Sequence, residues 1–190
     1  PIPVPFVAGQ IRSVLDDIGA DAIKIGMLHS SELIRSVKDT LAQYNISNIV
    51  LDPVMVATSG DKLLQDEAIN TLKNELIPAV RIITPNIPEA EILLEQKIKA
   101  QADLPRLVKN LSFGRKVSVL LKAGHLSDDT LTDVFYNAET DEIIELSSKR
   151  IQTQNTHGTG CTFSSAIAAF LAHGLELNDA VKKAKDYINM

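Results

Sequence analysis

Stretches with helical and strand-like patterns of apolar residues alternate along most of the chain. In residues 7–18 the apolar positions recur at helical spacing, and the short apolar run DAIKIGML that follows is typical of a buried strand. The same alternation continues to the carboxyl end. Helices are expected at residues 31–44, 65–79, 88–96, 102–112, 178–188 and after the motif THGTGC, and strands at 21–28, 47–55, 81–86, 117–125, 131–137 and 142–148.

Strands separated by helices predict a parallel sheet with helices on both faces. The last two strands are expected to form a hairpin around the turn AETD. We find no repeat, linker or low-complexity segment. The predicted fold class is therefore α/β, a mainly parallel α/β/α sandwich in a single domain.

Composition narrows the function class. Hydrophobic residues make up 45% of the 190-residue chain, enough for a sizeable core, and no apolar run is long enough to span a membrane. A net charge of −5 without a basic cluster argues against nucleic acid as the main partner. One cysteine excludes an internal disulfide, and the amino end does not resemble a secretory signal, so a cytoplasmic protein is expected. The sequence opens on Pro1 and stops inside a helical pattern, so we expect a piece of a longer chain.

The motif THGTGC places glycines directly before an apolar helix. Backbone N–H groups at such a helix start point in one direction and, with the helix dipole, form a site for an anion such as phosphate. The alternative is a helix cap whose glycines only turn the chain. The motif matches neither the Walker pattern nor the Rossmann fingerprint, so neither of those sites is implied.

Cys161 lies in or beside the first turn of that helix. A helix N-terminus favours the thiolate form of a cysteine, which could act as a base or nucleophile. The alternative is a small buried residue, the commonest role of a free cysteine.

The motif TPNIPEAEIL places Asn86 and Glu89 three residues apart at a helix start. An amide and a carboxylate on one helical turn could hold a hydrated magnesium ion. The alternative is a helix cap in which Asn86 accepts a hydrogen bond from the Glu89 N–H.

Lys122 ends a buried strand, a position where a lysine needs a partner such as a phosphate or an acid. Asp52, which ends the strand IVLD, is the candidate acid for the same site because ligands bind beyond the carboxyl ends of parallel strands. His125 and His157 remain ambiguous, and no His/Cys cluster suggests zinc. An anion site, a lysine, a magnesium pair and a base are together what phosphoryl transfer requires.

Five motifs in order resemble the hydroxymethylpyrimidine and phosphomethylpyrimidine kinases of thiamine biosynthesis, members of the ribokinase-like superfamily. The motifs are KIGML, LDPVM.ATSGDKLL, TPN.PEAE.L, LLKAGHL and THGTGCTFSSAIA, and the resemblance covers nearly the whole chain. It implies a Rossmann-like α/β/α sandwich that uses ATP and Mg²⁺ to phosphorylate a pyrimidine alcohol and then its monophosphate. It implies no nucleic-acid or membrane partner and allows a homodimer.

The resemblance also implies roles for individual residues. Gly158, Thr159, Gly160 and Cys161 would form the catalytic anion hole, with Cys161 as the candidate base. Met27, Val54 and Cys161 would line the pyrimidine pocket. Glu89 and Asn86 would hold magnesium through water. The residues implied to bind the nucleotide are Asp52, Asn86, Lys122, Gly124 and Thr156.

The family opens with a strand, a glycine-rich substrate loop and a glutamine that reads the pyrimidine edge, all of which would precede Pro1. The resemblance therefore implies one kinase domain over residues 1–190 that lacks its N-terminal strand and substrate loop and its C-terminal end. Such a piece alone would be poorly active. Two alternatives stay open: a pyridoxal kinase of the same branch, and a catalytically incomplete nucleotide-binding domain of a fusion protein.

Overall fold

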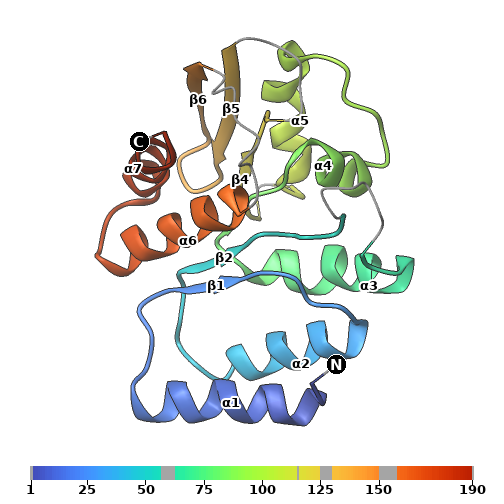
Figure 1. Cartoon of the computed structure of the whole chain (residues 1–190), viewed down its shortest axis with the longest axis vertical. Coiled ribbons are helices and arrows are strands. Elements are labelled where there is room, and N and C mark those ends of the chain that lie inside the picture. The colour runs from blue at the N-terminus through green and yellow to red at the C-terminus, as the bar shows by residue number, and fades with distance from the viewer. Residues whose placement is uncertain (1, 57–62, 115, 125–129, 150–157, 190) are drawn as a thin grey trace.

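The computed structural model describes residues 2–56, 63–114, 116–124, 130–149 and 158–189, which form a six-stranded sheet between two layers of helices (Figure 1). The strands lie side by side in chain order: β1 (Ile23–Ile25), β2 (Ile49–Leu51), β3 (Ile82–Ile83), β4 (Ser118–Leu121), β5 (Thr130–Asn137) and β6 (Glu142–Lys149). The first four are parallel, and β5 and β6 form the expected antiparallel hairpin.

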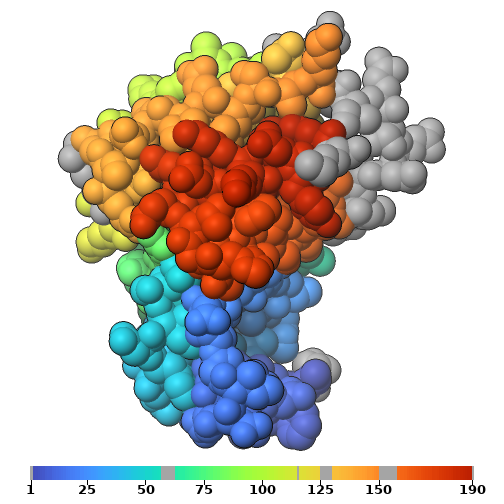
Figure 2. Space-filling view, turned by 90° about the vertical axis from the view of Figure 1, so that its left-hand side faces the viewer, coloured from blue at the N-terminus to red at the C-terminus, as the bar shows by residue number. Residues whose placement is uncertain are grey.

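Each face of the sheet has its own layer of helices. Right-handed crossovers between sequential parallel strands place the connecting helices on one face. That layer contains α2 (Ser31–Leu41), α3 (Asp66–Thr71), α4 (Ile87–Leu94) and α5 (Leu104–Leu111), with α1 (Val4–Asp17) packed against α2. The hairpin of α6 (Thr159–Ala172) and α7 (Leu177–Ile188) covers the other face (Figure 2).

The two-residue period of the strands divides the core between these layers. Val50, Ile82 and Leu120 face α6 and α7, whereas their neighbours Leu51 and Ile83 face the layer of α2 to α5. All five side chains are fully buried. Burial of each such side chain stabilises the fold by roughly 1.5–3 kcal/mol, so the apolar runs recognised in the sequence hold the strand ends in place.

The predicted α/β sandwich is confirmed, with local differences. Ser30 caps α2 by accepting a hydrogen bond from the Leu33 N–H at 3.2 Å. The single helix expected at 65–79 changes type, because α3 continues as a π-helical turn (Leu72–Leu76) and a 3₁₀ turn (Ile77–Ala79). Pro78 has no N–H to donate, so it cannot extend a regular helix. A 3₁₀ turn (Gln101–Asp103) likewise precedes α5.

No helix within the described ranges combines the length and apolar character needed to cross a membrane.

Candidate active site

Polar side chains follow three neighbouring parallel strands at the point where each strand ends. Asp52 follows β2, Thr84 follows β3 and Lys122 follows β4. Oδ1 of Asp52 accepts hydrogen bonds from Thr84 Oγ1 and from Lys122 Nζ, both at 2.9 Å. The structure thus brings together the acid and the lysine that the sequence assigned to one site.

This ion pair is almost removed from solvent, since the side chains of Asp52 and Lys122 are 4% and 14% exposed. Taking two charges out of water costs several kcal/mol per ion, and their attraction repays it only when the remaining hydrogen bonds are made. Thr84, which is 1% exposed, supplies one of these bonds. The backbone of Lys122 is also held, because its N–H donates to Pro85 O at 2.9 Å.

Asn86 and Glu89 form a complete capping box at the start of α4. Asn86 Oδ1 accepts from the Glu89 N–H at 2.9 Å, and Glu89 Oε2 accepts from the Asn86 N–H at 2.8 Å. The cap that the sequence allowed as an alternative is therefore present. The box also fixes both side chains at the carboxyl edge of the sheet, because Asn86 forms a parallel bridge with Lys122.

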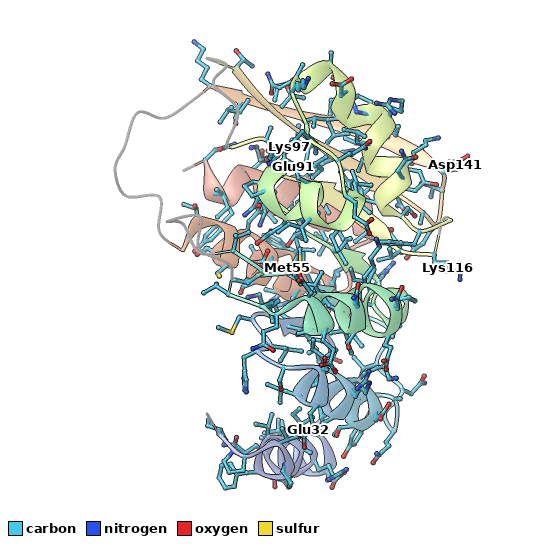
Figure 3. The ribbon with its side chains drawn as sticks, turned by 90° about the vertical axis from the view of Figure 1, so that its right-hand side faces the viewer. Glu32, Met55, Glu91, Lys97, Lys116 and Asp141 are labelled. Carbon is cyan, nitrogen blue, oxygen red and sulfur yellow. The ribbon has the colours of Figure 1, made fainter. Side chains whose placement is uncertain are left out.

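Glu89 differs from an ordinary surface glutamate. It is 3% exposed, and this burial raises its pKa from 4.5 to about 7. Lys122 and the Asn86 backbone act in the lowering direction, and the nearby Asp52 adds to the rise. The backbone of Met55, a buried residue labelled in Figure 3, also hydrogen bonds this carboxylate. A buried acid with a pKa near neutrality is a common feature of functional sites.

The N-terminus of α6 is built from the glycine motif. Gly158 is the N-cap residue with φ of 84°, a left-handed conformation that side-chain-bearing residues rarely adopt. Inside the helix, the Thr162 N–H donates to Gly158 O at 2.8 Å. The N–H groups of Gly160 and Cys161 precede that bond, so they have no acceptor within the helix. Cys161 is the third residue of α6 and is exposed.

Lys122 lies directly against this helix start. A Cβ added at Gly160 would be 3.1 Å from Lys122 Nζ, so a side chain at this position would force the lysine to shift. The ammonium group and the positive end of the helix dipole therefore meet at a position without a side chain. An anion bound here would satisfy both, which makes this corner suited to phosphate.

Magnesium fits beside this corner only in a partly hydrated form. Asp52 and Glu89 bring two buried carboxylates close to the ammonium group of Lys122, and such an acidic excess favours a cation. Within the described ranges, however, no three His, Cys, Asp or Glu side chains are arranged to enclose a metal. An ion held mainly by water and by substrate phosphates suits this arrangement, as is usual for Mg²⁺.

Met27, Val54 and Gly124 lie around the same edge. Met27 follows β1 and is 49% exposed, whereas Val54, which follows the paired strand β2, is half-buried. Gly124 is exposed two residues beyond Lys122. Thr156, His125 and His157 lie outside the described residues.

Sequence reasoning missed three polar contributors. Thr84 opens the motif TPNIPEAEIL, but the sequence predicts no role for it. Asp133 on β5 and Lys185 on α7 form a buried ion pair at 2.8 Å, next to the residue that follows Lys122. An acid inside the apolar strand LTDVFYN was the available signal. Lys185 had none, because it is one of several lysines in KKAKDYI.

Known proteins match the chain closely in sequence and in structure. The hydroxymethylpyrimidine/phosphomethylpyrimidine kinase of Escherichia coli K12 is 40% identical over 185 residues, which cover 97% of this chain and 69% of that protein. The crystal structure of phosphomethylpyrimidine kinase from Clostridium difficile 630 is 37% identical with a TM-score of 0.83, over 99% of this chain and 76% of that one. Bacillus subtilis pyridoxal kinase, solved as an ADP complex, is 34% identical with a TM-score of 0.86, over 100% of this chain and 70% of that one.

The sheet and its two helix layers, together with the solved kinases that they match, define a ribokinase-like phosphotransferase. More narrowly, the chain belongs to the phosphomethylpyrimidine kinase family, whose model matches residues 1–190. It is therefore a kinase, a class of enzyme that takes ATP as phosphoryl donor.

Proposed function

We propose that this kinase transfers a phosphoryl group from ATP to the hydroxymethyl group of 4-amino-5-hydroxymethyl-2-methylpyrimidine, and then a second one to the resulting monophosphate, in thiamine biosynthesis. The observation that carries the proposal is the position of Lys122 Nζ beside Gly160, 3.1 Å from where a Cβ would be, which brings a strand-end ammonium to a helix N-terminus in a member of this family. Phosphoryl transfer needs little more from a protein than charge neutralisation and positioning, and this corner offers both.

In the proposed site, Lys122 and the backbone around Gly124 contact the phosphates of ATP, with Thr156 as a further contact. Asp52 holds the Lys122 ammonium group in place through the 2.9 Å ion pair. The relative from B. subtilis was solved with ADP, which supports the binding of a nucleotide. Asn86 and Glu89 hold the water shell of Mg²⁺, which would neutralise phosphate charge when bound.

The start of α6 binds the phosphoryl group while it is being transferred. Backbone N–H groups of Thr159, Gly160 and Cys161 act as the anion hole, with Gly158 giving the turn that orients them. Cys161, acting as the base, takes the proton of the attacking alcohol as the new oxygen–phosphorus bond forms and the bond between the γ-phosphorus and the leaving ADP breaks. The exposed position of Cys161 at the mouth of the helix allows an acceptor to reach it.

The acceptor ring lies at the ends of β1 and β2, where Met27 and Val54 offer apolar contacts. Neighbouring strands are about 4.8 Å apart, so the end of β4, three strands away, is roughly 14 Å from β1. This width accommodates an acceptor ring, a phosphate and the start of a nucleotide along one edge. α6 packs against β1 and β2, and its first turn lies beside Lys122 at the end of β4.

A second candidate is phosphorylation of pyridoxal. The fold favours this candidate, since the TM-score to B. subtilis pyridoxal kinase is 0.86. The chemistry allows it too, because pyridoxal also presents a primary alcohol on a flat nitrogen ring. Apolar contacts such as those of Met27 and Val54 discriminate only modestly between similar rings, whereas hydrogen bonds to ring-edge groups discriminate strongly.

Coupled kinase assays on the full chain with three acceptors test the proposal: the pyrimidine alcohol, its monophosphate and pyridoxal, each with ATP and Mg²⁺. We expect turnover of the pyrimidine and of its monophosphate. The second step is the sharper test because pyridoxal kinases need only one transfer. Turnover of pyridoxal without conversion of the pyrimidine monophosphate would promote the second candidate, and nucleotide binding without any turnover would indicate a catalytically incomplete domain.

A cytoplasmic location and self-association into a homodimer belong to the same proposal. Sedimentation of the purified full chain gives its oligomeric state, and cell fractionation gives its location.

A further inference from the structure

A buried ion pair lies beside the proposed nucleotide site without being part of it. Asp133 on β5 and Lys185 on α7 are 6% and 9% exposed, and Lys185 Nζ donates to Asp133 Oδ2 at 2.8 Å. The two residues are 52 positions apart in the chain, so the pair joins the second helix layer to the antiparallel part of the sheet. Burying both charges is costly, and an apolar pair of similar volume would serve stability at least as well.

The second oxygen of Asp133 shows what the acid does locally. Oδ1 of Asp133 accepts a hydrogen bond from the Ala123 N–H at 2.7 Å. Ala123 directly follows Lys122, and the ladder between β4 and β5 has its last pair at Leu121 and Val134. The carboxylate thus continues the ladder beyond its last backbone pair and holds the chain where it leaves the sheet.

The segment Lys122–Ala123 is therefore fixed from both sides. On the β3 side the Lys122 N–H donates to Pro85 O at 2.9 Å, and on the β5 side the Ala123 N–H donates to Asp133. A hydrogen bond to an ionised acceptor is roughly twice as strong as a neutral one. Lys185 neutralises that acceptor and occupies its other oxygen, so the carboxylate of Asp133 stays directed at Ala123.

We infer that Asp133, held by Lys185, is a positioning residue for nucleotide binding. It fixes the backbone from which the Lys122 ammonium group and Gly124 reach the phosphates of ATP. Because Lys185 belongs to α7, which packs on α6, the same pair also links the helix hairpin whose first helix is capped by Gly158 to β5, the neighbour of β4. The inference rests on the proposed function for the identity of the nucleotide and for the contacts of Lys122 and Gly124 with its phosphates.

Two double variants of the full chain separate this role from a purely structural one. Asp133→Asn with Lys185→Met removes both charges but keeps an acceptor for the Ala123 N–H. Asp133→Leu with Lys185→Met also removes both charges and loses the acceptor. We expect the Leu/Met variant to bind ATP roughly tenfold more weakly, which corresponds to about 1.4 kcal/mol. For the Asn/Met variant, the Kd of ATP should stay within about twofold of the wild-type value.

The measurements are the Kd of ATP by calorimetry without any acceptor, the KM values of ATP and of the acceptor, and the melting temperature. The KM of the acceptor should not change, since Asp133 lies on the far side of β4 from Met27. A matched control is Arg81→Met with Glu139→Leu, an ion pair at the opposite end of the sheet, for which ATP affinity should not change. The Kd of ATP is measured without turnover, so this test remains valid even if the pyrimidine is not the acceptor.

A folded Leu/Met variant with unchanged ATP affinity would overturn the inference, as would equal losses for ATP and acceptor. If the Leu/Met variant does not fold, Asp133→Glu decides. The longer acid keeps the ion pair but displaces Ala123, so ATP affinity should fall. Wild-type ATP affinity in folded Asp133→Glu would show that the pair only stabilises the fold.

Discussion

Each end of the sheet carries an ion pair, but the two pairs differ in how deeply their side chains are buried. At the carboxyl end, the side chains of Asp52 and Lys122 are 4% and 14% exposed. At the amino end, those of Arg81 and Glu139 are 21% and 47% exposed and 2.7 Å apart. An exposed pair contributes about 0–1 kcal/mol, whereas a buried pair is often less favourable than apolar residues in its place. The pair whose burial is costly for stability therefore lies at the carboxyl end of the sheet, where a ligand would bind.

The amino end is also hollowed, without being suited to a phosphate. An open hollow of about 540 Å³ is lined by Arg81, Lys116, Ser118 and Glu139 among others. Its arginine is already occupied, because Arg81 donates to both carboxylate oxygens of Glu139 and to Asn48 Oδ1. Figure 3 shows Lys116 and Asp141 at this end and Met55 well away from them.

The same contrast occurs within α4. Glu89 is buried and its pKa is raised to about 7. For Glu91, burial acts to raise the pKa, but hydrogen bonds from Lys97 and from the Ile98 N–H outweigh it, so the pKa is lowered. Lys97 and Glu91 lie next to each other in Figure 3, 2.7 Å apart. One helix thus carries two different acids. The environment of Glu91, a structural acid, favours its ionised form, whereas that of Glu89, a candidate functional acid, disfavours it.

The largest effect is expected from Cys161→Ala. If the thiolate accepts the proton of the substrate alcohol, turnover should fall by roughly 10²-fold or more, the usual scale for a positioned base. Steady-state kinetics measures it, and the Kd of ATP should hardly change. Ser165→Ala, at an exposed position of the same helix, is the control and should keep wild-type turnover. Full activity of Cys161→Ala would contradict the role of Cys161 as the base and would mean that positioning by the anion hole is the main catalytic effect.

Gly160→Val should lose turnover by about 10²-fold, comparable to the loss of an oxyanion donor. The new side chain would displace Lys122 Nζ, which is 3.1 Å from the position of its Cβ. Gly9→Val in α1 is the matched control, because a Cβ there would have no atom within 4 Å apart from its chain neighbours and its own helix backbone. An active, folded Gly160→Val protein would show that the glycine motif is only a cap.

How far the sequence predicts this site depends on the kind of contact. Asp52 and Lys122 could be paired in advance, because carboxyl ends of parallel strands meet at one edge. Asn86 and Glu89 could be placed on one turn, but only the coordinates show that their side chains cap each other. The pair of Asp133 and Lys185 could not be predicted, since α7 meets β5 through tertiary packing that no local pattern encodes. The π-helical turn after α3 was likewise hidden, because periodicity in LKNEL does not distinguish helix types.

Glu89→Gln should stabilise the metal-free protein at pH 8. The pKa of Glu89 is raised from 4.5 to about 7, so the folded state binds more protons than the unfolded state between these values. The stability of the wild type therefore falls as the pH rises from 4.5 to 7, by on the order of 3 kcal/mol. Glutamine keeps the capping acceptor without the charge. Urea unfolding at pH 5 and pH 8 measures the difference.

The advantage of Glu89→Gln should shrink toward pH 5. Glu91→Gln is the control with the opposite sign: its carboxylate has a lowered pKa, so its contribution is present at pH 8 and is lost as the pH falls. A Glu89→Gln protein that is no more stable than the wild type at pH 8 would contradict the burial argument.

The same Glu89→Gln substitution should impair magnesium use. A carboxylate holds Mg²⁺ and its water shell better than an amide does, so the Mg²⁺ concentration for half-maximal activity should increase. A magnesium titration at saturating ATP measures it, with Glu91→Gln as the control. An unchanged titration would leave Asn86 and Glu89 with the capping role alone.

The smallest effect is expected at the amino end of the sheet. Glu139→Gln removes one charge of the pair with Arg81 but keeps its shape, and Arg81 retains Asn48 as an acceptor at 2.6 Å. Because the Glu139 side chain is 47% exposed, the free energy of unfolding should fall by less than about 1 kcal/mol, and less at high salt. The site at the other end of β4 is roughly 13 Å away at 3.3 Å per residue, so kcat and the KM of ATP should not change. Urea unfolding at two salt concentrations, with kinetics on the same samples, measures both. A loss of ATP affinity here would mean that the two ends of the sheet are coupled, and the contrast between them would then not separate function from stability.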